Sequence, residues 1–193
     1  DKMKFIWYKK KKEHFRVAIF GSARIKKNDK NYRMIYRLAK MIGKENMDIV
    51  TGGGPGIMEA ANRGHKVGSK TSYSFGLLIK LPREQRTNKS LDIKKEFHRF
   101  SKRLDEFMEL SNVVVVAPGG IGTLLELVYA WQLLQVRHIE HIPVILVGEQ
   151  WKKLIEWMKK YQLKQHYITK EDLDLVFTVK NIEETMDIIK KTH

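Results

Sequence analysis

Two glycine-rich turns, each set between a strand pattern and a helix pattern, constrain this chain more than any other feature of its sequence. One turn, Pro-Gly-Gly-Ile-Gly-Thr at residues 118–123, follows four consecutive valines and precedes an apolar stretch of helical length. The other, Gly-Gly-Gly-Pro-Gly at residues 52–56, lies between residues 48–51 and 57–64. A short, unbroken run of β-branched residues is typical of a buried parallel strand. The sequence therefore predicts two strand–turn–helix units. The helix that follows the turn at residues 52–56 is expected to end at Gly64.

The glycines in these turns indicate a phosphate site. Turns without side chains let backbone N–H groups approach an anion, and a helix N-terminus adds unpaired donors and partial positive charge. In the later turn Thr123 adds a hydroxyl, and Glu126 follows one helical turn later on the same side. A phosphate cradle with a carboxylate beside it suggests an enzyme that acts near a phosphorylated group. The alternative is that the glycines serve only as tight turns.

A third junction of this kind joins the strand predicted at residues 16–20 to Gly-Ser-Ala-Arg at residues 21–24. Loops at the carboxyl ends of parallel strands line one crevice, where open α/β sheets bind ligands. The first strand is followed by a single glycine instead of GxGxxG, and no GxxxxGK[ST] loop is present. The three turns therefore predict a crevice that is neither an ordinary dinucleotide site nor a nucleotide-hydrolysing phosphate loop.

Strand and helix patterns alternate along the chain, which predicts the fold class. We expect an α/β protein: a single Rossmann-like, doubly wound domain with a mostly parallel sheet flanked by helices. A polar loop at residues 82–90 is expected to lie over the crevice. Further strands are predicted at residues 73–79, 143–148 and 175–179. Residues 96–110 are predicted as the end of a strand followed by a helix. Other helices are predicted around residues 32–42, at residues 151–161 and after the cap Asn181.

Composition and charge limit the classes of function. The chain has 193 residues, of which 42% are hydrophobic, enough for a full core. The absence of cysteine excludes disulfides, thiolate nucleophiles and cysteine-bound zinc. The seven histidines have neither HxxxH nor HExxH spacing, so no metal and no cofactor is expected. No apolar run is long enough for a bilayer and no signal peptide is evident, so we expect no membrane partner and a cytoplasmic location.

The net charge of +15 raises the question of a nucleic acid partner. Four lysines at residues 9–12 are flanked by aromatic residues, a mix that can hold a single strand. The alternative is a solvated basic leader at residues 1–14 before a domain at residues 15–193. No recognition helix or RNA-binding motif follows, so nucleic acid binding is disfavoured.

The helix expected at residues 124–135 is apolar nearly all round. One face must cover the sheet, and the other, rich in Leu, Trp and Tyr, needs a second cover. A homodimer packed through this helix is the expected answer; the alternative is burial within the same chain.

A buried ion pair is predicted beside the crevice. Phe100, Leu104, Phe107 and Met108 form an apolar stripe, and Arg103 borders it. Glu126 lies among leucines and valine in the next helix and also needs a partner. The helix with Arg103 leads into the strand before Glu126, so the two side chains are expected to meet at the crevice. They form either a functional pair or a purely structural one.

These motifs resemble the LOG ("Lonely Guy") family, whose members are often labelled lysine decarboxylases. The family's PGGxGTxxE motif is matched by residues 118–126, and its arginine fifteen residues before the proline by Arg103. Residues 51–58 are similar to the family's other glycine loop. The usual lysine after the arginine is Leu104 here. Lysine decarboxylation itself is disfavoured, because it needs a Schiff-base lysine with pyridoxal phosphate and no lysine adjoins either glycine loop.

The resemblance implies a phosphoribohydrolase, which cleaves the N-glycosidic bond of a nucleoside 5′-monophosphate to free base and ribose 5-phosphate. AMP or a cytokinin-type nucleotide is the implied substrate. Arg103 and Glu126 are the implied catalytic residues, while Arg24 is a candidate phosphate or base contact and Glu59 either a ribose contact or a surface glutamate. The implied substrate- and phosphate-binding residues are Gly21, Ser22, Arg24, Gly52, Gly53, Gly54, Gly56, Met58, Glu59, Pro118, Gly119, Gly120, Gly122 and Thr123.

Two other classes of function stay open. A non-catalytic nucleotide sensor, or a carrier of a phosphorylated cofactor such as the molybdenum cofactor, would need the same cradle. Intact Arg103 and Glu126 favour the enzyme, since a carrier can lose either and keep the cradle. A DNA-binding relative of the same fold is supported only by charge.

Overall fold

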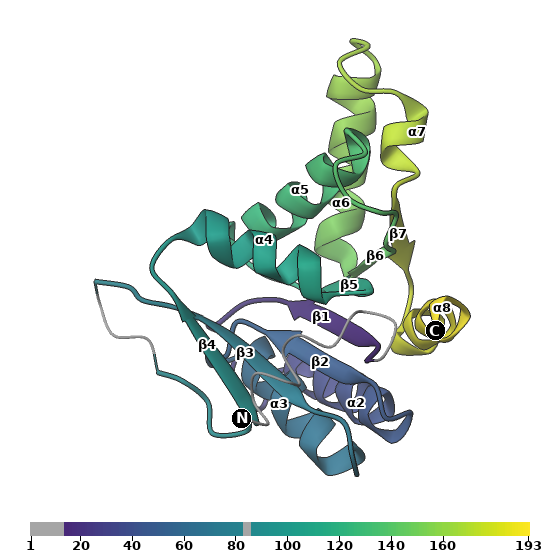
Figure 1. The fold of residues 1–193 in the computed structure, drawn as a ribbon. Helices are drawn as coiled ribbons and strands as arrows, with labels where there is room; N and C mark the ends of the chain where they lie inside the picture. The colour runs from purple at the N-terminus through teal and green to yellow at the C-terminus, as the bar shows by residue number, and fades with distance from the viewer. Residues whose placement is uncertain (1–13, 83–85) are drawn as a thin grey trace.

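Seven parallel strands form one sheet in the order β4-β3-β2-β1-β5-β6-β7 (Figure 1). The computed structural model describes residues 14–82 and 86–193, so the basic cluster at residues 9–12 lies outside the described residues. The predicted doubly wound α/β class is confirmed. The strands are β1 Arg16–Phe20, β2 Asp48–Thr51, β3 Ser74–Ile79, β4 Ile93–Phe97, β5 Val113–Val116, β6 Val144–Val147 and β7 Val176–Val179.

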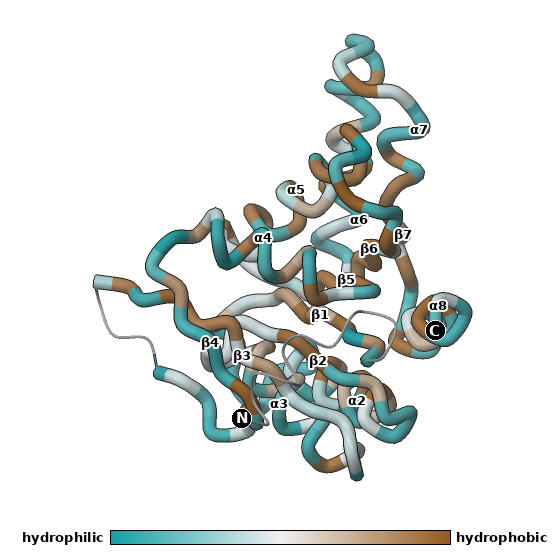
Figure 2. The backbone as a smooth tube through the Cα atoms, in the orientation of Figure 1, coloured by the Kyte–Doolittle hydropathy of each residue, from teal (hydrophilic) through white to brown (hydrophobic). Residues whose placement is uncertain are grey.

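Helices cover both faces of the sheet (Figure 1). Strand residues alternate between the faces, so Val17 and Ile19 belong to a core with α2, α3 and α8, whereas Ala18 and Phe20 belong to a core with α4, α5 and α6. Along the tube in Figure 2, hydrophobic segments gather in the strands. The helices are α2 Lys30–Lys44, α3 Ile57–Gly68, α4 Phe100–Leu110, α5 Ile121–Gln135, α6 Glu149–Met158 with its π-helical extension η1 Lys159–Leu163, α7 Lys170–Leu173 and α8 Ile182–Thr192.

The sheet reverses its direction of growth between β1 and β5. The chain builds outward from β1 to β4, returns to pair β5 with the other side of β1, and then continues to β7. Because every pairing is parallel, the carboxyl ends of β1, β2 and β5 meet at one edge on either side of this switch point. The three predicted turns therefore lie side by side, as the sequence requires for a shared crevice.

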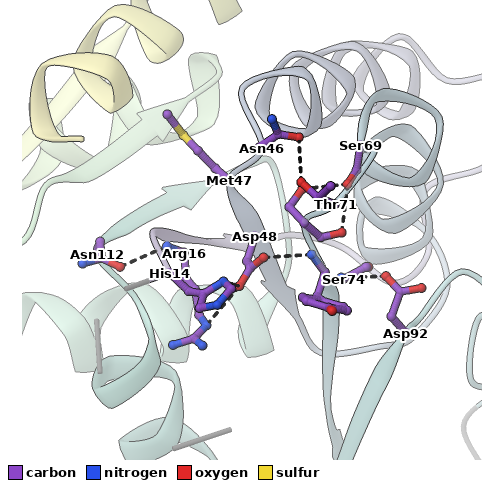
Figure 3. Close-up of polar contacts among 12 residues, drawn as sticks. His14, Arg16, Asn46, Met47, Asp48, Ser69, Thr71, Ser74, Asp92 and Asn112 are labelled. Atoms are coloured by element: carbon purple, nitrogen blue, oxygen red, sulfur yellow. Dashed lines mark hydrogen bonds and ion pairs between the residues drawn. The ribbon is translucent and has the colours of Figure 1, made fainter. Parts of the chain in front are cut away.

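The opposite edge carries polar side chains that accept hydrogen bonds from the starts of strands (Figure 3). Asp48 accepts from the backbone N–H of Tyr73 at 2.8 Å, and Asn112 accepts from that of Arg16 at 3.0 Å. Nε of Arg16 lies 3.4 Å from the Asp48 carboxylate. Burial raises the pKa of Asp48, and the hydrogen bond from Tyr73 and the charge of Arg16 oppose the rise. The polar side chains at this edge therefore stabilise the starts of the strands.

Two expectations drawn from the sequence are wrong, one about the end of a helix and one about a buried side chain. Gly64 does not end α3, which continues to Gly68; instead, a Cβ at Gly64 would collide with the backbone of Tyr36 in α2. Gly64 is therefore needed for close packing of two helices. Phe100 does not join the buried stripe of α4: 51% of its surface is exposed, whereas Leu104, Phe107 and Met108 are buried.

The outer face of α5 is apolar and partly exposed. Ile121, Leu125 and Val128 are among the large hydrophobic residues that remain accessible. The opposite side of the helix packs on the sheet through Leu127, Ala130 and other buried residues. The expected homodimer through α5 stays a prediction.

We expect Gly64→Ala to lower the free energy of unfolding by about 1–3 kcal/mol, because the added methyl group forces α2 and α3 apart. The matched control is Gly122→Ala in α5, where a Cβ meets no atom within 4 Å. That substitution should be neutral or slightly stabilising through helix propensity. Denaturant unfolding of both variants checks this, and equal effects would contradict the close α2–α3 contact.

Candidate active site

A cavity of about 440 Å³ opens at the switch point of the sheet. Its size lies within the range of small-molecule sites. All three predicted turns contribute to it, and so do the starts of α4 and α5. The lining residues are Ile19, Phe20, Gly21, Ser22, Ala23, Arg24, Gly52, Met58, Ile79, Leu81, Phe100, Arg103, Gly120, Ile121, Gly122, Thr123 and Glu126.

The structure brings Arg103 and Glu126 together in this cavity. Nη1 of Arg103 lies 3.7 Å from Oε1 of Glu126. Nε of Arg103 donates to the carbonyl of Leu77 at 2.7 Å, and the guanidinium lies over the ring of Phe107, 5.3 Å from its centroid. Gly52 gives the arginine its space, since a Cβ there would collide with the guanidinium. Contacts with Leu77, Phe107 and Gly52 therefore hold the guanidinium in place beside the carboxylate of Glu126.

The environment of Glu126 changes its acidity. Only 14% of its side chain is exposed. Burial raises the pKa of Glu126 to about 7, and the positive charge of Arg103 opposes that rise. Burial likewise lowers the pKa of Arg103, with Glu126 opposing. A carboxyl group that titrates near neutral pH inside a cavity is typical of catalytic sites.

The glycines at the start of α5 differ in what surrounds them. A Cβ at Gly119 would collide with Thr123, so Gly119 serves packing. A Cβ at Gly120 or Gly122 would meet no atom within 4 Å, and both residues line the cavity. Packing within the described chain gives no reason for glycine at these two positions. Space for a ligand beside the N-terminus of α5 gives one.

Contacts between the turns hold the first of them in place. The backbone N–H of Ser22 donates to the carbonyl of Pro118 at 3.1 Å, and that of Ile57 donates to the carbonyl of Ser22 at 2.9 Å. Gly56 has a φ of 69° and passes so close to Ser22 that a Cβ would collide with its carbonyl. Arg24 is exposed at the rim of the cavity.

Several predicted binding residues lie outside the cavity lining. Gly53 and Gly54 line a neighbouring pocket, which shares Gly52 with the first. Glu59 pairs with Lys27 at 3.2 Å and does not line the cavity. The backbone N–H of Gly119 donates to the side-chain oxygen of Gln150 at 3.1 Å, and the Gln150 amide donates to the carbonyl of Gly119 at 2.7 Å.

A buried hydrogen-bond network behind the glycine loop at residues 52–56 was not predicted from the sequence. The Asn88 amide donates to the carbonyl of Gly54 and to Asn62, each at 2.9 Å. Thr51 donates to the same Asn62 oxygen at 2.8 Å, and Asn62 donates to Ser74 at 2.7 Å. The available signal was Asn62 itself, a polar residue directly after two alanines on the buried face of a helix.

Neither a metal centre nor a membrane span is found in the described part of the chain. Within residues 14–82 and 86–193 no group of three or more His, Asp or Glu side chains is placed to hold a metal ion. Within the same ranges no helix is long and apolar enough to cross a bilayer.

Comparison with known proteins shows the family. A family model described as "Possible lysine decarboxylase" matches residues 58–189, which is more than half of the chain. The chain belongs to this family, and the resemblance to LOG-type proteins drawn from the PGGxGTxxE motif is confirmed.

The curated relatives include a nucleosidase. The chain is 29% identical over 144 residues to the pyrimidine/purine nucleotide 5′-monophosphate nucleosidase of Escherichia coli strain K12, and equally to that of strain O157:H7. The match covers 68% of this chain and 30% of the relative. The chain thus corresponds to about 30% of the length of these relatives.

Solved structures share the fold with different named roles. The molybdenum cofactor carrier protein of Chlamydomonas reinhardtii has a TM-score of 0.67 at 22% identity, covering 93% of this chain and 98% of that one. The molybdenum cofactor binding protein of Rippkaea orientalis has a TM-score of 0.65 at 22% identity, covering 92% and 94%. DNA processing protein A of Helicobacter pylori has a TM-score of 0.58 at 15% identity, covering 93% and 81%. At these identities the likeness concerns the fold alone.

We expect Glu126→Gln to gain stability relative to the unsubstituted protein as pH rises from about 4.5 to 7. The folded pKa of Glu126 lies above its ordinary value of 4.5, so the folded state holds the extra proton and loses stability as pH rises through this window. Glutamine does not titrate, so the difference in unfolding free energy should grow by on the order of 3 kcal/mol.

Denaturant unfolding at several pH values checks this expectation. The matched control is Glu156→Gln on α6, whose carboxyl side chain is 64% exposed. The pH-dependent gain in unfolding free energy should be larger for Glu126→Gln than for this exposed control. A gain for Glu126→Gln no larger than that of the control would contradict the raised pKa of Glu126.

Proposed function

We propose that the protein is a nucleotide phosphoribohydrolase, which hydrolyses the N-glycosidic bond of a nucleoside 5′-monophosphate. The observation that carries the proposal is the Arg103–Glu126 pair, set one helical turn behind a glycine-lined helix N-terminus in one cavity. Membership of the LOG-type family and the similarity to a nucleotide 5′-monophosphate nucleosidase support it.

The N-terminus of α5 is the proposed site of the 5′-phosphate. Its first turn offers unpaired backbone N–H groups and partial positive charge, and the open space at Gly120 and Gly122 lets phosphate oxygens come close. Thr123 adds a hydroxyl donor, and Arg24 at the rim adds a positive charge. Binding of a dianion at this point places the ribose toward Glu126.

Glu126 is the proposed catalytic carboxylate. As the bond from C1′ to the base nitrogen breaks, its electron pair leaves with the base and positive charge develops at C1′ and the ring oxygen. An ionised Glu126 stabilises that charge and orients the ribose hydroxyls and the attacking water. Water supplies the hydroxyl group at C1′ and the proton on the departing base, so the products are free base and ribose 5-phosphate.

Arg103 has a supporting part in this proposal. Its charge favours the ionised form of Glu126 against the effect of burial. The hydrogen bond to Leu77 and the contact with Phe107 keep the guanidinium from turning away when a ligand enters. The pair therefore supplies a carboxylate that is both oriented and ionisable near neutral pH.

A non-catalytic carrier of a phosphorylated cofactor is the second candidate. The fold is shared with molybdenum cofactor carrier and binding proteins, and the α5 cradle suits any phosphate group. A carrier has no need for a raised carboxyl pKa beside the cradle, so Glu126 favours the hydrolase.

We expect the protein to release free base and ribose 5-phosphate from at least one member of a panel of purine and pyrimidine nucleoside 5′-monophosphates. Glu126→Gln should lower kcat/KM at least about 100-fold, because the developing charge at C1′ loses its carboxylate. Chromatography of the base and an assay of ribose 5-phosphate provide the measurement. The control, Glu156→Gln, should keep full activity. Binding of monophosphates without release of base would favour the carrier.

The pH dependence of the reaction should report Glu126. Its carboxyl group must be ionised to act, and its pKa is raised to about 7. We therefore expect kcat/KM to fall about tenfold per pH unit below that value and to level off above it. The residual activity of Glu126→Gln should lack this limb. An acidic limb near pH 4.5 in the unsubstituted enzyme would contradict the assignment.

A further inference from the structure

Phe100 exposes an aromatic ring where the fold gives no reason for one. It is the first residue of α4, 51% of its surface is accessible, and it lines the same cavity as Arg103 and Glu126. The other apolar residues of its stripe are buried in the core. Exposed aromatic surface gains nothing for the folded chain, so its place at a cavity wall points to a ligand.

A series of neighbours links Phe100 to the reacting centre. Phe100 precedes Arg103 by three residues, so both side chains lie on one side of α4, about 5–6 Å apart at their Cβ atoms. Arg103 contacts Glu126, and Glu126 lies one turn from the N-terminus of α5. Four groups therefore follow one another along the cavity: the N–H donors at the start of α5, the carboxylate of Glu126, the guanidinium of Arg103 and the ring of Phe100.

The other cavity-lining residues include both polar and apolar groups. Gly120, Gly122 and Thr123 from α5 and its N-terminus surround the proposed phosphate and ribose positions. Met58 from α3, Ile79 at the end of β3 and Leu81 just after it add apolar surface, as Phe100 does from α4. A nucleoside monophosphate has the same division, with an anionic phosphate, a polar sugar and a flat base.

We propose that Phe100 is the stacking platform for the base of the nucleotide and favours purines over pyrimidines. This inference rests on the proposed function and assigns the base-contacting side of that site. An aromatic side chain stacks on the face of any base, typically worth about 1–3 kcal/mol per base. The larger purine face overlaps more of the ring, so the gain is greater for a purine. Phe100 acts on affinity and choice of base, whereas Glu126 acts on bond cleavage.

The test separates the base from the rest of the ligand. The full chain carrying Glu126→Gln, which slows turnover, is titrated by calorimetry with AMP, UMP and ribose 5-phosphate. Adding Phe100→Ala should weaken AMP binding about 5-fold to 100-fold and UMP binding less. The affinity for ribose 5-phosphate should change less than about 2-fold, because that ligand has no base.

Further variants distinguish stacking from folding. Phe100→Trp should restore AMP binding, whereas Phe100→Leu, which is apolar without an aromatic face, should restore only part of it. The matched control is Phe177→Ala on β7, where the ring is 39% exposed and lies outside the cavity lining. It should leave all three affinities unchanged. In the catalytically intact chain, Phe100→Ala should raise KM for AMP far more than it lowers kcat.

The possible failures are distinguishable. Unchanged AMP affinity in Phe100→Ala, or an equal loss for AMP and ribose 5-phosphate, would overturn the stacking role while leaving the hydrolase proposal in place. Absence of binding by every monophosphate and by ribose 5-phosphate would refute both proposals. A larger loss for UMP than for AMP would overturn the purine preference.

Discussion

Parallel pairing of all seven strands is the constraint on which the rest of this structure depends. It forces every connection to cross back over the sheet, so every strand ends at the same edge. Helices make these crossings except between β3 and β4, where the described residues form no helix. Reversal of strand order beside β1 then leaves a gap between the loops after β1, β2 and β5. Residues more than a hundred positions apart in the chain, such as Ser22 and Thr123, line one cavity for this reason.

The site has a cost for the fold that serves it. Arg103 and Glu126 are mostly buried, and their mutual attraction does not fully offset the loss of hydration, because the pKa of Glu126 remains raised. Well-packed apolar residues often stabilise a protein more than a buried ion pair at the same positions does. In the proposed hydrolase, this loss of stability would accompany a carboxyl group whose raised pKa serves catalysis, as in other proteins where stability and activity compete.

Much of the fold and part of the site could be predicted from sequence, because the signals were local. Unbroken valine runs, glycine turns and helical periodicity mark the elements, and Arg103 and Glu126 stand out as charges on apolar faces. The remainder depends on which surfaces meet. Gly64 has the sequence signature of a helix end, but α2 lies against it; Phe100 continues an apolar stripe, but α4 begins at the cavity rim. Periodicity identifies a face of a helix without saying where the covering sheet stops.

The buried amides of Asn62 and Asn88, behind the glycine loop at residues 52–56, have a further consequence. Asn88 donates hydrogen bonds to two successive carbonyls of the loop, from its backbone N–H to Gly53 and from its side-chain amide to Gly54. Asn62 links Asn88 to β2 and β3. A triple-glycine segment would otherwise be among the most disordered parts of a chain, with a large entropy loss on meeting a ligand. Here folding has already ordered the loop. Gly52 lines the cavity, and Gly53 and Gly54 line the neighbouring pocket. A ligand at either place would therefore meet a preorganised surface, and little of its binding energy would be consumed in ordering the loop.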